Sequence, residues 1–277
     1  MMKKLSIITI NYNNSKGLEK TIESIIKQTY LEYEYIIIDG GSTDNSINII
    51  KKYANKIDYW ISEPDKGIFN AMNKGIEQAT GEYCNFMNSG DCFHTNDVFE
   101  KVVPLLNKDI VTGKYIFGNQ PHPWGAIATI SMLDFVKGGI CHQSAFIRRD
   151  LFKDNCYDEN FKIVSDSKFF IDALIFKNCS YTNVDIIIAD FDASGISSIS
   201  SELNEIERAR ILREYLPERI YIDYMRFAKA DSPLLELTPL FNKTNGFQKL
   251  IFHVVSFLIK MRSLLLRTKH LFYIFKK

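Results

Sequence analysis

The feature of this sequence that most restricts its fold is an alternation of apolar runs and amphipathic segments over residues 5–87. Apolar runs rich in β-branched residues lie at 5–10, within 33–46, and at 57–62 and 81–87. Segments such as 68–79 lie between them and carry their apolar residues on one helical face. This spacing predicts a parallel α/β sheet with right-handed crossovers. Ligands of such sheets bind beyond the carboxyl ends of the strands, so the polar residues after each strand are candidates for a site.

The second half of the chain is less regular. We expect strands at 109–117 and 181–191, and a loop, a strand and a helix start within 138–152. A helix at 165–175 would open at Ser165 or Asp166, and a charged amphipathic helix would cover 202–216. Residues 115–140 have no pattern from which a structure can be predicted. No run reaches the roughly 18 apolar residues that a transmembrane helix needs.

Charge divides the chain into two parts. Residues 240–277 contain eight basic side chains and no acidic one, and subtracting these charges from the net +1 leaves −7 for residues 1–239. A basic tail favours an anionic partner, either a membrane surface or a nucleic acid. The five cysteines are odd in number and contain no CxxC pair, which argues against a disulfide framework or a zinc site and favours a reducing compartment.

Four motifs stand in order at the predicted strand ends: Tyr12–Asn13, "DGGSTD" at Asp39–Asp44, Asn73–Gly75 and Thr80–Tyr83. Together with the loop "NSGD" at 88–91 they resemble the inverting nucleotide-sugar glycosyltransferases of family 2, which have the GT-A fold. The stretch 62–83 looks like the branch that builds bacterial surface polysaccharides. The resemblance covers 4–92 strongly and 138–198 more loosely. It implies a Rossmann-like α/β GT-A domain at 1–200, with a mixed, mostly parallel sheet flanked by helices, and a helical extension at 201–277.

The resemblance places the donor nucleotide at the strand ends. Tyr12 offers an aromatic face on which a base can stack, and Asp39 offers a polar partner for the edge of the base. The alternative is that Tyr12 is a core aromatic residue and Asp39 caps a turn. Asp65 and Asn73 would face the ribose or the diphosphate, or else lie in a turn and on a helix surface. The resemblance implies a UDP-linked donor, and the remaining residues that we assign to its nucleotide are Asn13, Asn88 and Ser89.

The loop "NSGD" departs from the family pattern D-x-D-D, because it keeps only the last carboxylate, Asp91. A divalent cation, Mn²⁺ or Mg²⁺, would neutralise the charge on the leaving diphosphate. We expect Asp91 to hold it with water, phosphate oxygens and the amide of Asn88. Two alternatives stay open. The site is metal-independent and uses a basic group from the set Lys66, Lys74, His142 and Arg148, or the loop is only a turn in an inactive site.

Inversion requires a general base that deprotonates the acceptor hydroxyl. The resemblance assigns this role to Asp166; the alternatives are that Asp166 only caps its helix and that Asp172 is the base. His142 and Gln143 in "CHQS" resemble a pair that contacts the diphosphate or the acceptor, and "GISS" at 195–198 suggests a lid. The chain lacks the Q-x-x-R-W motif of processive members, so it should add one sugar and release its product.

The segment 247–277 mixes apolar residues with seven basic ones and has no acidic residue. A helix of this kind is typical of binding in the interface of an anionic membrane. The alternative is a helix packed on the body, and we expect no nucleic-acid partner. The sequence thus predicts a cytoplasmic, peripheral membrane enzyme that transfers one sugar from a nucleotide sugar to a lipid-linked saccharide. The competing hypothesis is a non-catalytic nucleotide-sugar- or membrane-binding partner.

Overall fold

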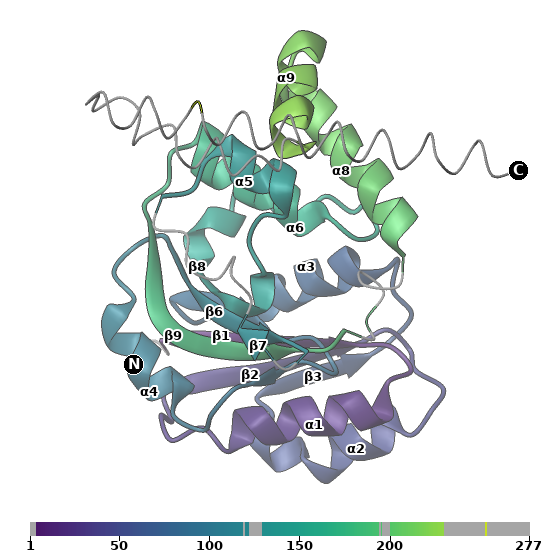
Figure 1. Ribbon diagram of the computed structural model, residues 1–277. Coiled ribbons are helices and arrows are strands. Elements are labelled where there is room, and N and C mark those ends of the chain that lie inside the picture. The colour runs from purple at the N-terminus through teal and green to yellow at the C-terminus, as the bar shows by residue number, and fades with distance from the viewer. Residues whose placement is uncertain are drawn as a thin grey trace, which may run out of the picture. The chain divides into compact units, whose positions relative to one another are not determined.

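A computed structural model describes residues 4–118, 120–121, 129–193, 195, 200–229 and 253 (Figure 1). The strands are β1 Leu5–Asn11, β2 Tyr33–Asp39, β3 Tyr59–Ser62, β4 Tyr83–Phe86, β5 Cys92–Phe93, β6 Ile110–Phe117, β7 Gln120–Pro121, β8 Ala145–Arg148 and β9 Tyr181–Phe191. The α-helices are α1 Ser15–Ile26, α2 Ser46–Lys52, α3 Ile68–Gln78, α4 Val98–Val102, α5 Met132–Lys137, α6 Ser165–Phe170, α8 Ser201–Tyr215 and α9 Glu218–Lys229. Short helical turns lie at η1 Ala54–Lys56, η2 Val103–Leu105, η4 His142–Ser144, η5 Arg149–Phe152 and η6 Ile171–Phe176.

One mixed sheet runs through the described part of the chain in the order β3-β2-β1-β4-β8-β6-β9-β5, with β7 paired to β6. The strands β1 to β4 are parallel to one another, as the alternating pattern predicts. The strands after β4 bring antiparallel pairs, because β8 lies between β4 and β6 and β9 pairs with β5. The expected mixed, mostly parallel α/β sheet is confirmed.

Both faces of the sheet are covered, because successive side chains of a strand point to opposite faces. Leu5 and Ile7 of β1 pack with α1 and α2, whereas Ile8 and Ile10 pack with α3 and with the helical segment after residue 165. Figure 1 shows α1 and α2 on one side of the sheet and α3 on the other. This two-sided burial explains why the first strands read as continuous apolar runs rather than as alternating ones.

One buried carboxylate, at the amino ends of the parallel strands, connects several segments of the chain. Glu34 of β2 accepts hydrogen bonds from the Ser6 hydroxyl at 2.5 Å, from the Thr80 hydroxyl at 2.7 Å and from the Gly81 amide at 3.0 Å. Thr80 and Gly81 belong to the T-G-E-Y motif. That motif therefore serves the fold, since it connects α3 to β4 by binding Glu34.

Close packing explains the glycine of the N-K-G motif on α3. A Cβ atom at Gly75 would lie 2.4 Å from Cγ2 of Ile8, which is closer than real contacts allow. The missing side chain lets α3 approach the sheet. Because α3 packs on β1 and β2, the loop that connects β3 to α3 is held near the carboxyl ends of these strands.

The compact unit extends from Met1 to Met225 and includes α8, which the sequence analysis assigned to the extension. Glu207 of α8 is 6% exposed and accepts hydrogen bonds from the backbone of Lys162 and Ile163 at 2.8 and 2.9 Å. These bonds fasten α8 to the loop before α6. The organisation of the extension beyond this unit stays a prediction, and the tail 247–277 lies outside the described residues apart from His253.

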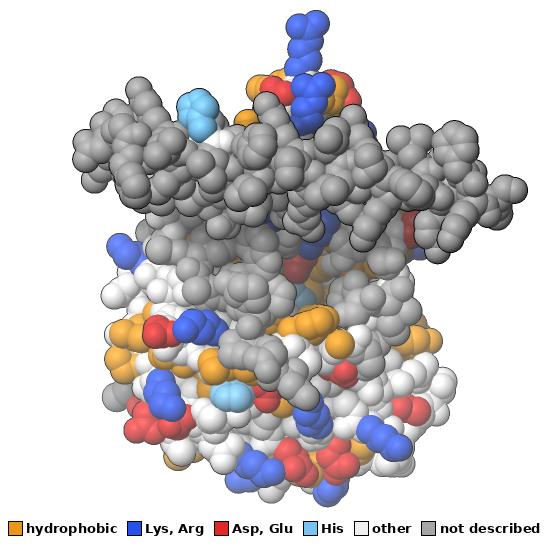
Figure 2. Space-filling model, in the orientation of Figure 1, with side chains coloured by type: hydrophobic (Ala, Val, Ile, Leu, Met, Phe, Trp, Pro, Cys, Tyr) orange, Lys and Arg blue, Asp and Glu red, His pale blue; other side chains and the backbone are white. Residues whose placement is uncertain are grey.

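Some elements differ from the sequence expectation. The helix at 165–175 begins at Ser165 as expected, but its second part, η6, is a π-helix. The sequence pattern did not indicate α5, whereas α9 lies within the range 201–277 in which helices were expected. No helix in the described part of the chain has the length and apolar character needed to cross a bilayer. On the face drawn in Figure 2, acidic and basic side chains intermingle over the described surface, without a patch of one sign.

Candidate active site

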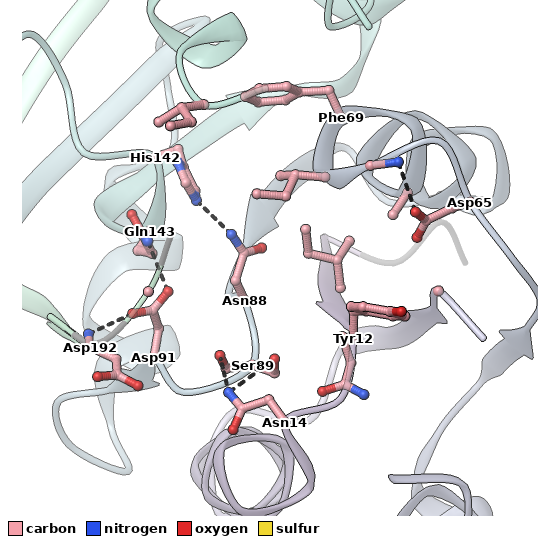
Figure 3. A pocket seen from close by; sticks show the side chains of 18 of the residues that line it. Tyr12, Asn14, Asp65, Phe69, Asn88, Ser89, Asp91, His142, Gln143 and Asp192 are labelled. Carbon is pink, nitrogen blue, oxygen red and sulfur yellow. Dashed lines mark hydrogen bonds between the residues drawn. The ribbon is translucent and has the colours of Figure 1, made fainter. Parts of the chain in front are cut away.

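A cavity of about 810 Å³ lies where the parallel strands end. Its walls come from segments that directly follow β1, β2, β3 and β4, and from η4 and the end of β9. In Figure 3, Tyr12 and Asp65 lie on one side and Asp91, Gln143 and Asp192 on the other, with Asn88 between them. The volume falls within the range of about 300–1,000 Å³ that small-molecule sites occupy. The expected position of the site at the strand ends matches this cavity.

Tyr12 presents its ring to the cavity and is 66% exposed, so it is not a core aromatic residue. Asp65 also lines the cavity, and its carboxylate accepts a hydrogen bond from the Gly67 amide at 2.8 Å. A Cβ atom at Gly40 would lie 2.5 Å from Oδ2 of Asp65 and 3.3 Å from the Tyr12 ring. The glycine leaves room for both side chains, which form an open aromatic and acidic wall.

Asp39 lies behind this wall and does not line the cavity. It is fully buried, and its two oxygens accept four hydrogen bonds, from Asn11 at 2.7 Å, from the Ser42 hydroxyl and amide at 2.6 and 2.9 Å, and from Ser62 at 2.6 Å. Burial raises the pKa of this carboxyl, but the hydrogen bonds lower the pKa by more, so that it lies below its usual value. The contacts are those of the turn-capping interpretation, and a role in binding the base stays a prediction.

Two further residues assigned to the nucleotide point elsewhere. The Asn73 amide donates to the Tyr157 carbonyl at 2.9 Å and accepts from the Tyr157 amide at 3.0 Å, so it ties α3 to the loop before α6. Asn13 accepts a hydrogen bond from the Thr43 amide at 2.8 Å. Neither Asn73 nor Asn13 is among the cavity-lining residues, whereas Asn88 and Ser89 are. Asn14, which the sequence analysis did not select, also lines the cavity and donates to the Ser89 carbonyl at 3.0 Å.

Asp91 is the centre of a hydrogen-bonded group at the far wall. It is 5% exposed, its Oδ2 accepts from the Gln143 amide at 2.8 Å, and its Oδ1 accepts from the backbone amide of Asp192 at 2.7 Å. Burial raises the pKa of the Asp91 carboxyl, while both hydrogen bonds act in the opposite direction. The loop "NSGD" is thus joined to η4 and to the segment after β9, and is more than an isolated turn.

The oxygen atoms around Asp91 are ligands of the type that a hard cation prefers, but they are too few to fill its coordination shell. No group of three or more His, Cys, Asp or Glu side chains that could hold a metal occurs in the described ranges. However, Asp192 lines the same wall, and the buried Oδ1 of Asn88 has no hydrogen-bond partner among the described residues. Each Asp91 oxygen also keeps a second lone pair. The residues therefore fit a cation that takes most of its ligands from water and a bound diphosphate.

His142 connects Asn88 to Asp166. Its Nδ1 lies 2.9 Å from Oδ2 of Asp166, and its Nε2 lies 3.1 Å from the Asn88 amide nitrogen. Because an amide nitrogen only donates, Nε2 is the acceptor and the ring proton lies on Nδ1, where it is donated to Asp166. The side chains of His142 and Asp166 are each 14% exposed. Asp166 is the second residue of α6, and its other oxygen accepts from the Ser167 amide at 2.7 Å.

A second cavity of about 340 Å³ adjoins the first, and Asp166 lines only the second. Four residues line both cavities, namely His142, Gln143, Ile163 and Phe191. Asp166 therefore stands on the far side of a wall that the two cavities share. Asp172, the fallback candidate for the base, lines neither cavity and accepts from the Tyr215 hydroxyl at 2.6 Å.

The basic groups considered for a metal-independent site are mostly engaged elsewhere. Lys74 pairs with Glu63 at 2.6 Å, and Arg148 pairs with Glu82 at 3.1 Å. Neither they nor Lys66 line the large cavity, whereas His142 does. Sequence reasoning missed Asp192, for which "DFDASG" offered only an acidic residue before a glycine. Of the expected lid at 195–198, only Gly195 lies within the described residues, and it borders the cavity.

Comparison with known proteins identifies the family. The pattern of the family described as glycosyl transferase family 2 matches residues 6–155. A glycosyltransferase of Mycobacterium tuberculosis is 32% identical over 70% of this chain and 77% of its own length. The poly(ribitol-phosphate) β-N-acetylglucosaminyltransferase TarP of Staphylococcus aureus is 30% identical over 75% of this chain and 72% of its own length.

Solved structures show the same fold. Residues 1–349 of TarS from Staphylococcus aureus, in complex with UDP-GlcNAc, align with a TM-score of 0.61 at 20% identity, over 80% of this chain and 70% of that chain. A mannosyltransferase from Pyrobaculum calidifontis, in complex with GDP-Man and Mn²⁺, gives a TM-score of 0.63 at 13% identity, over 93% and 81%. The chain therefore belongs to glycosyltransferase family 2 and is an enzyme that transfers a sugar from a nucleotide-sugar donor.

Proposed function

We propose that this enzyme transfers one sugar per binding event, with inversion, from a UDP-sugar to a lipid-linked saccharide of a surface polysaccharide. The observation that carries the proposal is the position of Asp166. Its carboxylate lines the smaller cavity and is bonded to His142, which lies at the boundary between this cavity and the large one. A donor in the large cavity and an acceptor in the small one would meet at this boundary. There the carboxylate takes the proton of the acceptor hydroxyl as that oxygen attacks the anomeric carbon, and the bond from that carbon to the phosphate oxygen breaks to release UDP.

The donor side is supported by the exposed ring of Tyr12, which offers a stacking face for the base beside Asp65. UDP is the nucleotide that we propose, because TarS, which shares the fold, was solved with UDP and with UDP-GlcNAc. Calorimetric titration of UDP tests this assignment, with GDP as the comparison. Binding of GDP in preference to UDP would overturn the choice of nucleotide and leave the donor cavity in place.

The metal that we propose is Mn²⁺ or Mg²⁺, held by Asp91 and Asp192 with the Asn88 amide oxygen. When bound, it would neutralise the negative charge that develops on the diphosphate. The protein residues hold the wall in place, since Gln143 and the Asp192 backbone fix the Asp91 carboxylate. UDP titrations in Mn²⁺, in Mg²⁺ and in EDTA test the assignment on the wild type and on Asp91→Ala. Metal-dependent affinity that the substitution abolishes is expected, and equal affinity in EDTA would exclude the metal.

The base is tested with Asp166→Asn, which keeps the size of the side chain but not its basicity. Loss of a general base costs about 10²- to 10⁴-fold in rate, so UDP release in the presence of acceptor should fall by that factor. The affinity for UDP should stay unchanged, because Asp166 does not line the donor cavity. Asp172→Asn is the matched control, since it removes a carboxylate of the same helical segment that lines neither cavity. Equal rates in Asp166→Asn and the wild type would refute the assignment.

The lipid-linked acceptor and the position at the inner face of the cell membrane rest on the basic, apolar sequence 247–277. We propose that this segment binds an anionic bilayer surface. Flotation with vesicles tests it: the protein should float with vesicles rich in phosphatidylglycerol and not with pure phosphatidylcholine. Replacing Lys260, Arg262 and Arg267 by Gln should reduce flotation. Equal flotation with both vesicle types would contradict the electrostatic part of the proposal.

A further inference from the structure

The smaller cavity carries an inference that rests on the proposed function and extends it to the acceptor. The carboxylate of Asp166 lines this cavity. Two basic side chains line it as well, namely Arg208 of α8 and Lys137 at the end of α5. Within the described residues, neither forms an ion pair with a carboxylate. The other arginines of α8 do form ion pairs: Arg210 pairs with Glu214 at 3.3 Å, and Arg213 pairs with Glu218 at 3.6 Å.

Arg208 is half-buried and held in a defined position. Its Nε donates to the amide oxygen of Asn204 at 2.7 Å, one turn earlier on α8, which leaves the other two guanidinium nitrogens without a bond among the described residues. The neighbouring Glu207 fastens the helix by accepting the backbone amides of Lys162 and Ile163. Burial lowers the pKa of Arg208, and the charge of Asp166 acts in the opposite direction. The carboxylate of Asp166 bonds to His142 and not to the guanidinium, so the two charges attract each other without a direct ion pair.

A positively charged group of this kind recognises phosphate or carboxylate. The planar guanidinium presents parallel N–H donors that match two oxygens of such a group, and it stays protonated at all physiological pH values. In a half-buried position, the charge–charge attraction is screened less than at the surface. The unpaired nitrogens of Arg208 therefore predict an anion in the cavity.

Three aromatic side chains also line the cavity. Tyr115 and Phe117 of β6 and Phe191 at the end of β9 line it, with ring centroids of Phe117 and Phe191 5.6 Å apart. Phe117 is 44% exposed. Aromatic faces carry negative charge density and attract the weakly positive C–H groups of a sugar ring. The cavity thus combines a surface for a sugar ring, a base at Asp166 and a cation at Arg208.

We infer that the smaller cavity binds an acceptor saccharide that bears a negatively charged group, phosphate or carboxylate, close to the hydroxyl that is glycosylated. Arg208 binds the charged group, and Phe117 and Phe191 support the sugar ring. Asp166 receives the proton of the attacking hydroxyl, as the proposed function requires. A neutral saccharide leaves the guanidinium without its partner and binds more weakly.

Calorimetry on the full chain saturated with UDP tests this inference, because UDP occupies the donor side and prevents anions from binding there. The probes are glucose, glucose 6-phosphate, glucuronic acid and inorganic phosphate, at one ionic strength. We expect the two anionic sugars to bind at least about tenfold more tightly than glucose, the gain typical of a hydrogen bond to a charged group. A preference for only one of them identifies the group as phosphate or carboxylate. Tight binding of inorganic phosphate without any gain from the sugar would overturn the saccharide part.

The variants are Arg208→Gln, Arg208→Lys and the matched control Arg210→Gln, which alters an exposed arginine of the same helix outside both cavities. Arg208→Gln should reduce the affinity for anionic sugars to that for glucose, Arg208→Lys should retain part of it, and Arg210→Gln should retain all of it. A preference that survives Arg208→Gln, equal affinities in the wild type, or no sugar binding at millimolar concentration would overturn the inference. Titration of UDP alone shows whether each variant is folded, and a wild type without UDP binding would instead refute the proposed function.

Discussion

His142 is the residue whose substitution tests the arrangement of the site most directly. It bonds Asp166 in the small cavity and Asn88 in the large one, and both distances are near 3 Å, at 2.9 and 3.1 Å. We expect it to orient the Asp166 carboxylate rather than to bind the donor. A hydrogen bond to a charged group contributes about 1.5–3 kcal/mol. If the bond acts only in the transition state, its loss lowers kcat by roughly 10- to 150-fold, at about 1.4 kcal/mol for each factor of ten.

His142→Phe removes both bonds and keeps a planar ring. The assay is the rate of UDP release with acceptor, together with the dissociation constant of UDP. We expect kcat to fall and the UDP affinity to change by less than about twofold. Ser144→Ala is the control in the same turn, because Ser144 lines neither cavity and bonds only the Cys141 carbonyl.

The double variant of His142→Phe with Asp166→Asn separates positioning from independent action. If His142 acts through Asp166, the double variant is no slower than Asp166→Asn alone, since residues that act as a unit are not additive. Two results would refute this reasoning. An unchanged kcat would show that the bond has no role in catalysis. A weakened UDP affinity with kcat retained would assign His142 to the diphosphate, the other role that its sequence motif suggested.

Three further predictions concern the scaffold and the donor wall. Glu34→Ala should lower the free energy of unfolding by about 3 kcal/mol or more in chemical denaturation, since it leaves several buried donors unpaired at ~1–3 kcal/mol each. Burial raises the pKa of Glu34, but the bonds it accepts, led by the Ser6 hydroxyl and by Thr80, lower it below the usual 4.5. The contribution of the Glu34 carboxylate to the free energy of unfolding is therefore complete above pH 4.5 and is lost as pH falls through the lower folded-state pKa. In Glu34→Gln, the free energy of unfolding should depend less on pH in this range. Tyr12→Ala should weaken UDP binding roughly 5- to 150-fold, from ~1–3 kcal/mol of base stacking, whereas Tyr12→Phe should have little effect.

The first half of the fold could be predicted because its information is local. Strands β1, β2 and β4 are buried on both faces, so each is visible as an apolar run. The structural role of the T-G-E-Y motif could not be predicted, because Glu34 meets Thr80 only after β2, β1 and β4 have paired. A glutamate inside an apolar run is the signal that could have been used. Such a residue requires buried donors from elsewhere in the chain.

Part of the site could also be predicted from local sequence information. Residues directly after strands, such as Tyr12, Asn88 and Asp91, could be placed from strand ends alone. Asp192 could not, because it approaches Asp91 through the antiparallel pairing of β5 with β9, in which Cys92 lies opposite Asp190. Arg208 enters the small cavity only because α8 packs on the loop before α6. Long-range pairing and helix docking leave no periodic trace in the sequence.

Two departures of the loop "NSGD" from the family pattern fit the side chains that surround it. Position 90, where the family pattern has an acidic residue, has φ +108°, and a Cβ atom there would lie 2.5 Å from Oδ2 of Asp192. A side chain at 90 would therefore force the carboxylate of Asp192, which follows β9, to move away from the loop. Position 88 carries an amide that donates to His142, which a carboxylate could not do. Both departures from the pattern thus have a partner in the site, which favours a working donor loop over an inactive turn.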